Sequence, residues 1–195
     1  MNDRLALVNR LKSIGSPRVI STTAADEKKL AAIERRFHVT LPDDLRAALE
    51  WSDGVAIHGD ASKIQLYGVD DLEFANLDEG FLEDLPDMLV FGDDGDGSIY
   101  FYDPQNKLEL GAYSVYMVKQ GQLGFDHARH CGASVSVMVQ AIVGGEDLSD
   151  IPAYKTAPPD APATIVPDAP ATERPPAGYE EEEVDDAPTR RDPTV

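Results

Sequence analysis

Apolar residues recur at helical spacing in three segments near the start of the chain. These segments cover residues 5–14, 26–38 and 42–53, and each carries one apolar stripe beside charged faces. Gly15 stands where the first helix should end, and Pro42 suits the first turn of the third. The pattern therefore predicts three amphipathic helices, the third of which ends at Gly54.

From residue 62 onward the periodicity changes to one that is typical of strands. A run of Gly and Asp over residues 92–97 separates two β-type segments, which predicts a hairpin with an acidic tip. Two short helical turns are expected before it, and an apolar helix over 135–142 is expected to close the domain. The expected strands cover residues 64–67, 88–91, 98–102 and 108–118, and the expected helical turns cover residues 69–74 and 77–82.

This order of elements predicts an α+β domain over residues 1–152. Its N-terminal helices and C-terminal helix would pack on a mixed, mainly antiparallel sheet. In the second hairpin strand, Ile99 and Phe101 alternate with Tyr100 and Tyr102. We expect the more apolar pair to face the closing helix and the two tyrosines to lie on the other face, near the acidic turn.

After residue 152 the composition changes abruptly. Residues 153–195 contain nine prolines and few large apolar side chains, and one hexapeptide occurs twice, from Pro159 and from Pro167. Such a segment cannot bury enough apolar surface to offset its ordering entropy. The sequence therefore predicts a disordered acidic tail that is rich in Pro, Ala and Glu.

Charge narrows the classes of partner. The formal net charge is −19, and residues 43–103 carry 17 acidic but only 2 basic side chains, after an opening segment that is basic. This balance argues against nucleic acid and anionic membranes, and it favours a basic protein partner. A lone cysteine and the absence of a signal-like start lead us to expect a cytoplasmic protein, and no stretch is apolar enough to suggest a membrane span.

The sequence shows no motif for catalysis, a cofactor or a metal. Asp126, His127, His130 and Cys131 lie close together, but no second Cys or His pair completes a zinc site. The turn at residues 92–97 lacks the ligand spacing of an EF-hand, and no phosphate loop or nucleophile motif is present. We therefore expect a non-enzymatic protein without a cofactor or bound metal.

The candidate contact residues are acidic and aromatic side chains near two turns. Tyrosines within a charged rim are typical of protein-binding surfaces, because they bury a large area and keep a polar end. The predicted partner-binding residues are Asp53, His58, Asp60, Asp93, Asp94, Asp96, Tyr100 and Tyr102.

Three local motifs resemble the SUKH superfamily, the Smi/Knr-type domain. The most specific covers residues 34–54, where an amphipathic helix is followed by Leu-Pro-Asp-Asp-Leu and a helix that ends in Trp-Ser-Asp-Gly. The others are the strand, Gly/Asp turn and strand of residues 89–103, and the closing helix of residues 134–144. The resemblance covers roughly residues 20–145 and does not extend to the tail.

The resemblance implies a non-enzymatic domain of helices on a mixed sheet. Bacterial members of this superfamily are mostly immunity proteins that neutralise a cognate polymorphic or contact-dependent toxin, and the fungal relatives act in cell-wall regulation. We therefore expect an immunity protein that occludes a basic toxin domain with an acidic surface. The alternative is a scaffold or regulatory interaction module that uses the disordered tail.

Overall fold

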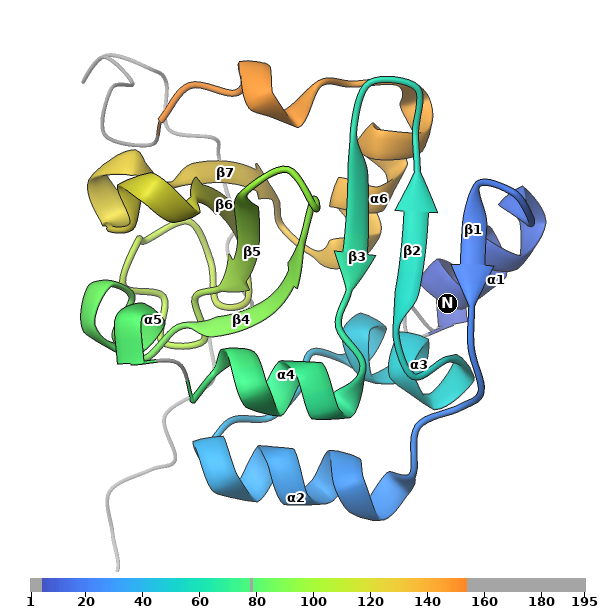
Figure 1. Ribbon diagram of the computed structural model, residues 1–195, viewed down its shortest axis with the longest axis horizontal. Helices are drawn as coiled ribbons and strands as arrows, with labels where there is room; N and C mark the ends of the chain where they lie inside the picture. The colour runs from blue at the N-terminus through green and yellow to red at the C-terminus, as the bar shows by residue number, and fades with distance from the viewer. Residues whose placement is uncertain (1–4, 78, 154–195) are drawn as a thin grey trace, which may run out of the picture. The chain divides into compact units, whose positions relative to one another are not determined.

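A computed structural model describes residues 5–77 and 79–153 of the chain. Within these residues seven strands form one antiparallel sheet in the order β1-β2-β3-β4-β5-β6-β7, so that each strand pairs with its neighbours along the chain. Because the sheet twists, β4–β7 run at a large angle to β1–β3 (Figure 1). The strands are β1 (Val19–Ser21), β2 (Val55–His58), β3 (Lys63–Leu66), β4 (Leu89–Asp93), β5 (Ser98–Tyr102), β6 (Val115–Lys119) and β7 (Arg129–Gly132).

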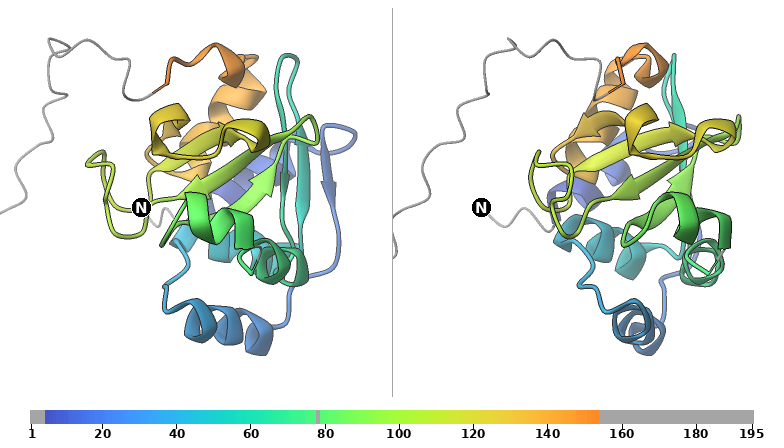
Figure 2. Two further views of the ribbon diagram at one scale, coloured as in Figure 1. Left: turned by 60° about the vertical axis from the view of Figure 1, so that its left-hand side comes forward. Right: turned by 90° about the vertical axis from the view of Figure 1, so that its left-hand side faces the viewer.

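Six α-helices accompany the sheet in the described part of the chain. Helices α1, α3 and α6 contact one another, and α6 also packs on β2 and β7 (Figure 2). Helix α2 lies beside α4, outside this group. The helices are α1 (Ala6–Ile14), α2 (Glu27–Phe37), α3 (Asp43–Trp51), α4 (Val69–Ala75), α5 (Glu79–Asp84) and α6 (Val135–Gly144). The predicted α+β class is confirmed, and every strand pair described is antiparallel.

Both faces of the inner strand β5 are covered, and the predicted orientation of its side chains is wrong. Tyr100 and Tyr102 belong to the main core, which they share with Met138 of α6 and other apolar residues. Ile99 and Phe101 face a second, smaller core on the opposite side. The prediction had these faces reversed, because alternation reveals the two faces of a strand but cannot identify what covers each of them.

The predicted long strand over residues 108–118 is also wrong. Only Val115–Lys119 forms a strand, and the chain before it is a loop that the buried carboxylate of Asp103 organises. One Asp103 oxygen accepts the Leu108 N–H at 2.7 Å, and its backbone carbonyl accepts the Tyr113 N–H at 3.0 Å. Several loop residues, including Asn106 and Gly111, have positive φ, which a strand does not tolerate.

Three strands were not predicted at all. Strands β1, β2 and β7 have only three or four residues each, so that a hydrophobic period cannot be recognised in them. The predicted tail, residues 153–195, lies outside the described residues except for Ala153. No helix in the described ranges is long and apolar enough to cross a membrane.

Candidate functional site

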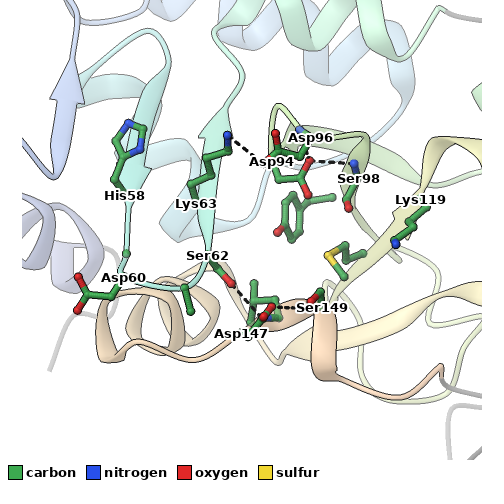
Figure 3. Close-up of a pocket in the computed structure, with 15 residues that line it drawn as sticks. His58, Asp60, Ser62, Lys63, Asp94, Asp96, Ser98, Lys119, Asp147 and Ser149 are labelled. Atoms are coloured by element: carbon green, nitrogen blue, oxygen red, sulfur yellow. Dashed lines mark hydrogen bonds and ion pairs between the residues drawn. The ribbon is translucent and has the colours of Figure 1, made fainter.

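Two turns and one later segment border a polar hollow of about 450 Å³ at the ends of inner strands of the sheet. One wall is the β2–β3 turn, a second is the β4–β5 turn, and residues 147–149 form the third (Figure 3). We call this site the turn hollow. Its lining residues are His58, Gly59, Asp60, Ala61, Ser62, Lys63, Asp94, Asp96, Ser98, Tyr100, Met117, Lys119, Asp147, Leu148 and Ser149.

Contacts between distant segments hold the β2–β3 turn in place. The Ser62 hydroxyl donates to the carbonyl of Glu146 at 3.0 Å and accepts the N–H of Leu148 at 3.0 Å. Gly59 lies against the end of α6, where a Cβ on this residue would stand 2.0 Å from the carbonyl oxygen of Ile142. The turn can therefore reach α6 only because Gly59 has no side chain.

The β4–β5 turn is held by its own aspartates. Asp93 accepts the Gly95 N–H at 2.7 Å, and Asp94 accepts the N–H groups of Asp96 at 2.7 Å and Ser98 at 2.9 Å. Such side-chain bonds to the backbone a few residues on are what make Asp favourable in turns. The acidic tip of the predicted hairpin is thus present, and it has a fixed shape.

Two carboxylates of the turn hollow stay ionised at neutral pH. Partial burial would raise the pKa of Asp94, but hydrogen bonds from Ser98 and Asp96 outweigh burial and hold that pKa below its ordinary value. The side chain and backbone of Ser149 lower the pKa of Asp147 in the same way. Neither carboxylate forms an ion pair with a described Lys, Arg or His.

We expect Asp94→Asn to change how stability depends on pH. Because the folded pKa of Asp94 lies below that of the unfolded chain, about 3.9, the charge stabilises the fold above that pH. At neutral pH the variant should lose about 1 kcal/mol of unfolding free energy. This difference should shrink as the pH falls below about 4 and through the folded pKa.

Urea unfolding from pH 7 to pH 2.5 measures this difference. Asp84→Asn is the matched control, because Asp84 is exposed at the end of α5 and no hydrogen bond to it is found in the described residues. A difference for Asp94→Asn that stays constant down to pH 2.5 would contradict the assignment.

Other acidic side chains of the predicted surface are matched by cations of the same chain. Asp60 pairs with Arg18 at 2.6 Å, and Asp96 pairs with Lys63 at 3.0 Å. Away from the turn hollow, the basic opening segment reaches the acidic section through the pairs Lys29–Asp70 and Arg36–Glu73. Part of the acidic surface expected from the charge pattern is therefore matched within the chain, whereas Asp94 and Asp147 in the turn hollow have no ion pair with a described residue.

The structure places several predicted contact residues in the turn hollow and others outside it. His58, Asp60, Asp94 and Asp96 line the turn hollow from two separate turns. Asp93 lies at the end of β4 and does not line it, and the carboxylate of Asp53 instead accepts the N–H of Val69 at 2.6 Å, at the start of α4.

The prediction that Tyr100 and Tyr102 are contact residues on the surface is wrong. Tyr100 is 1% exposed and Tyr102 is fully buried, so neither ring is available as a protruding contact. Tyr100 still lines the turn hollow from within, whereas Tyr102 does not. The reason is the reversed orientation of β5, which turns both tyrosines toward the main core.

Several lining residues were not predicted. Lys63, Lys119, Asp147 and Ser149 come from elements that are separated along the chain, and no local pattern in the sequence marks them. The clearest signal in the sequence was the Gly/Asp run at residues 92–97, because its composition favours a turn between two strands.

The Cys and His residues weighed as a metal site can be followed in the described part of the chain. No group of three or more metal-ligating side chains occurs there. Burial raises the pKa of the Cys131 thiol to about 12, so that it stays protonated at neutral pH. His130 has its pKa lowered by burial, and its ring lies 5.4 Å from that of Tyr116.

A family model matches most of the described residues. The model of the SMI1 / KNR4 family (SUKH-1) matches residues 24–140, which is more than half of the chain. The match includes both turns of the hollow and ends before the wall that contains Asp147. No curated protein matches the chain.

Proposed function

The chain belongs to the SMI1 / KNR4 family (SUKH-1), and from this premise we propose that it is an immunity protein that neutralises a cognate polymorphic or contact-dependent toxin. The family includes toxin immunity proteins, and its domains generally bind proteins and do not catalyse reactions. In this proposal the chain acts by occluding the toxin, and no catalytic step is involved.

The turn hollow is the observation that carries the proposal. It presents ionised carboxylates on backbone turns that are anchored to the rest of the domain, so little order has to be gained when a partner binds. Negative charge at a fixed, partly enclosed site attracts a basic macromolecule and speeds its encounter. We therefore propose that a basic toxin domain docks on the face that contains this hollow.

Ion pairs within the chain indicate which carboxylates are most available to a toxin. Asp60 and Asp96 are already matched, and such exposed pairs contribute only about 0–1 kcal/mol each. A toxin cation can exchange with Arg18 or Lys63 at little cost, but the strongest attraction should come from the carboxylates that have no cation beside them. Asp94 and Asp147 are therefore the proposed centre of the contact.

A rescue assay tests this function. The chain and the toxin encoded by the neighbouring gene are produced in the same cells, and we expect the chain to restore growth. A variant that lacks residues 153–195 should protect equally well, because the proposed site lies wholly within the described domain.

Two results would contradict the proposal. The first is a failure to bind or protect against the product of either adjacent gene. The second is loss of protection on removal of residues 153–195 alone, which would favour the scaffold or regulatory module that acts through this segment.

A further inference from the structure

We propose that the turn hollow receives an arginine side chain of the partner protein, held between Asp94 and Asp147 above the hydroxyl of Tyr100. This inference rests on the proposed function, since the arginine would belong to the toxin. It adds which side chain of the partner enters the hollow, which neither the family nor the charge of the chain specifies.

The two carboxylates lie on different walls of the hollow. Asp94 belongs to the β4–β5 turn and Asp147 to the segment that follows α6 (Figure 3). Each is oriented by a hydrogen bond from its own segment, the Ser98 N–H at 2.9 Å for Asp94 and the Ser149 N–H at 2.8 Å for Asp147. A cation that enters between them meets acceptors on two sides that need no rearrangement.

Tyr100 supplies an independent observation that points to a ligand. Its side chain is 1% exposed and lines the turn hollow, yet its hydroxyl makes no hydrogen bond with any described residue. Burial, and the negative charge of Asp94 and Asp147 among others, raise the pKa of this hydroxyl, which therefore stays protonated. The hydroxyl oxygen is not sealed in the core, because Tyr100 lines the hollow, so a group bound there can supply the partner that the protein does not.

Arginine fits this arrangement better than other side chains. Its guanidinium has five N–H donors in a rigid plane and no acceptor, so one group can donate hydrogen bonds to two carboxylates. The hydroxyl oxygen of Tyr100 can accept a further N–H, and the apolar side chain of Met117 also lines the hollow, where it can contact the methylene stem. A volume of about 450 Å³ is within the range of small ligand sites, roughly 300–1,000 Å³.

Neither lysine of the hollow forms an ion pair with Asp94 or Asp147. The ammonium of Lys63 is paired with Asp96 at 3.0 Å. Lys119 is exposed, and its flexible stem allows the ammonium to move into solvent when another cation enters. Their presence should lower the affinity for arginine without closing the site.

A titration with a small probe tests the inference on the full chain. Nα-acetyl-arginine amide is added to ¹⁵N-labelled protein, and its citrulline counterpart, which has the same shape but no charge, serves as the comparison. We expect a dissociation constant of about 1–10 mM, with shifts concentrated at residues 58–63, 94–98 and 147–149. The citrulline probe should bind at least tenfold more weakly.

Matched variants identify the acceptors. Asp94→Asn/Asp147→Asn keeps the shape of both side chains and should weaken arginine binding about tenfold or more. Tyr100→Phe should weaken it about threefold. The control Glu83→Gln/Asp84→Asn removes the same charge at exposed positions on α5 and should change the affinity less than twofold.

Equal binding of the arginine and citrulline probes, shifts centred outside these three segments, or an unchanged affinity in Asp94→Asn/Asp147→Asn would each overturn the inference. Its failure is distinguishable from that of the proposed function. Protection against the toxin with no arginine binding leaves the function standing, whereas arginine binding without protection against any adjacent toxin leaves only the site.

Discussion

Replacing Gly59 by Ala is expected to destabilise the domain by about 2–4 kcal/mol and to open the turn hollow. The added Cβ would stand 2.0 Å from the carbonyl oxygen of Ile142 and 2.9 Å from that of Ser62, and both are backbone atoms that cannot move aside as a side chain would. The clash forces the β2–β3 turn away from α6. Overpacking against a well-ordered interior costs energy of this order.

The same displacement should weaken partner binding. Ser62 follows Gly59 in the turn and bridges to Glu146 and Leu148, so movement of the turn also moves the segment that carries Asp147. We expect the midpoint of thermal unfolding to fall by about 5–15 °C and toxin affinity to fall with it.

Gly144→Ala is the matched control for Gly59→Ala. Gly144 is the last residue of α6, and a Cβ there would meet no atom within 4 Å. This substitution should leave stability unchanged or raise it by up to about 1 kcal/mol. Thermal unfolding followed by circular dichroism compares the two, and a Gly59→Ala midpoint within 2 °C of the parent chain would show that the turn does not depend on this close approach.

Much of the fold could be predicted because its helices are amphipathic and its hairpin has a distinctive turn. The apolar stripe of residues 5–14 gives α1, which ends at Gly15 with φ of 64° as expected. The Gly/Asp run over residues 92–97 gives the β4–β5 turn. In each case a local physical preference and the tertiary structure agree.

The orientation of β5 could not be predicted, because both of its faces are buried. All five residues of Ser98–Tyr102 are buried, so that the choice between a Tyr face and an Ile/Phe face depends on what packs against each. The larger core accepts the tyrosines, and the smaller one accepts Ile99 and Phe101. Only knowledge of the helices on both sides would have resolved this.

The charge pattern likewise predicted that the middle section is acidic, but it could not predict which of these acidic residues form ion pairs with Lys or Arg of the same chain. Arg18 and Asp60 are 42 residues apart in sequence, and Lys29 and Asp70 are 41 apart, yet each pair is in contact. Long-range pairing of this kind depends on the topology of the sheet and helices. The same holds for the turn hollow, whose third wall contacts the β2–β3 turn from more than 80 residues away.

Reversing the charge of the turn hollow tests the central claim, that this face binds the partner. We expect Asp94→Lys/Asp147→Lys to weaken toxin binding by at least 100-fold, because removing two oriented carboxylates and adding two cations creates repulsion where attraction is needed. The control Glu83→Lys/Asp84→Lys makes the same change in net charge on α5, which precedes β4 and so lies at the end of that strand opposite the β4–β5 turn. Circular dichroism confirms that both variants are folded, and Asp147→Lys alone, at an exposed position, provides a milder change.

The decisive measurement is the dissociation constant of the complex with the adjacent toxin, determined by calorimetry for the parent chain and these variants at 50 and 200 mM salt. The account predicts a large loss for Asp94→Lys/Asp147→Lys, a smaller loss for Asp147→Lys, and less than a fivefold change for Glu83→Lys/Asp84→Lys. Equal losses in the two double variants would show that only net charge matters, and unchanged affinity in Asp94→Lys/Asp147→Lys would place the partner on another face. Either result would contradict the account.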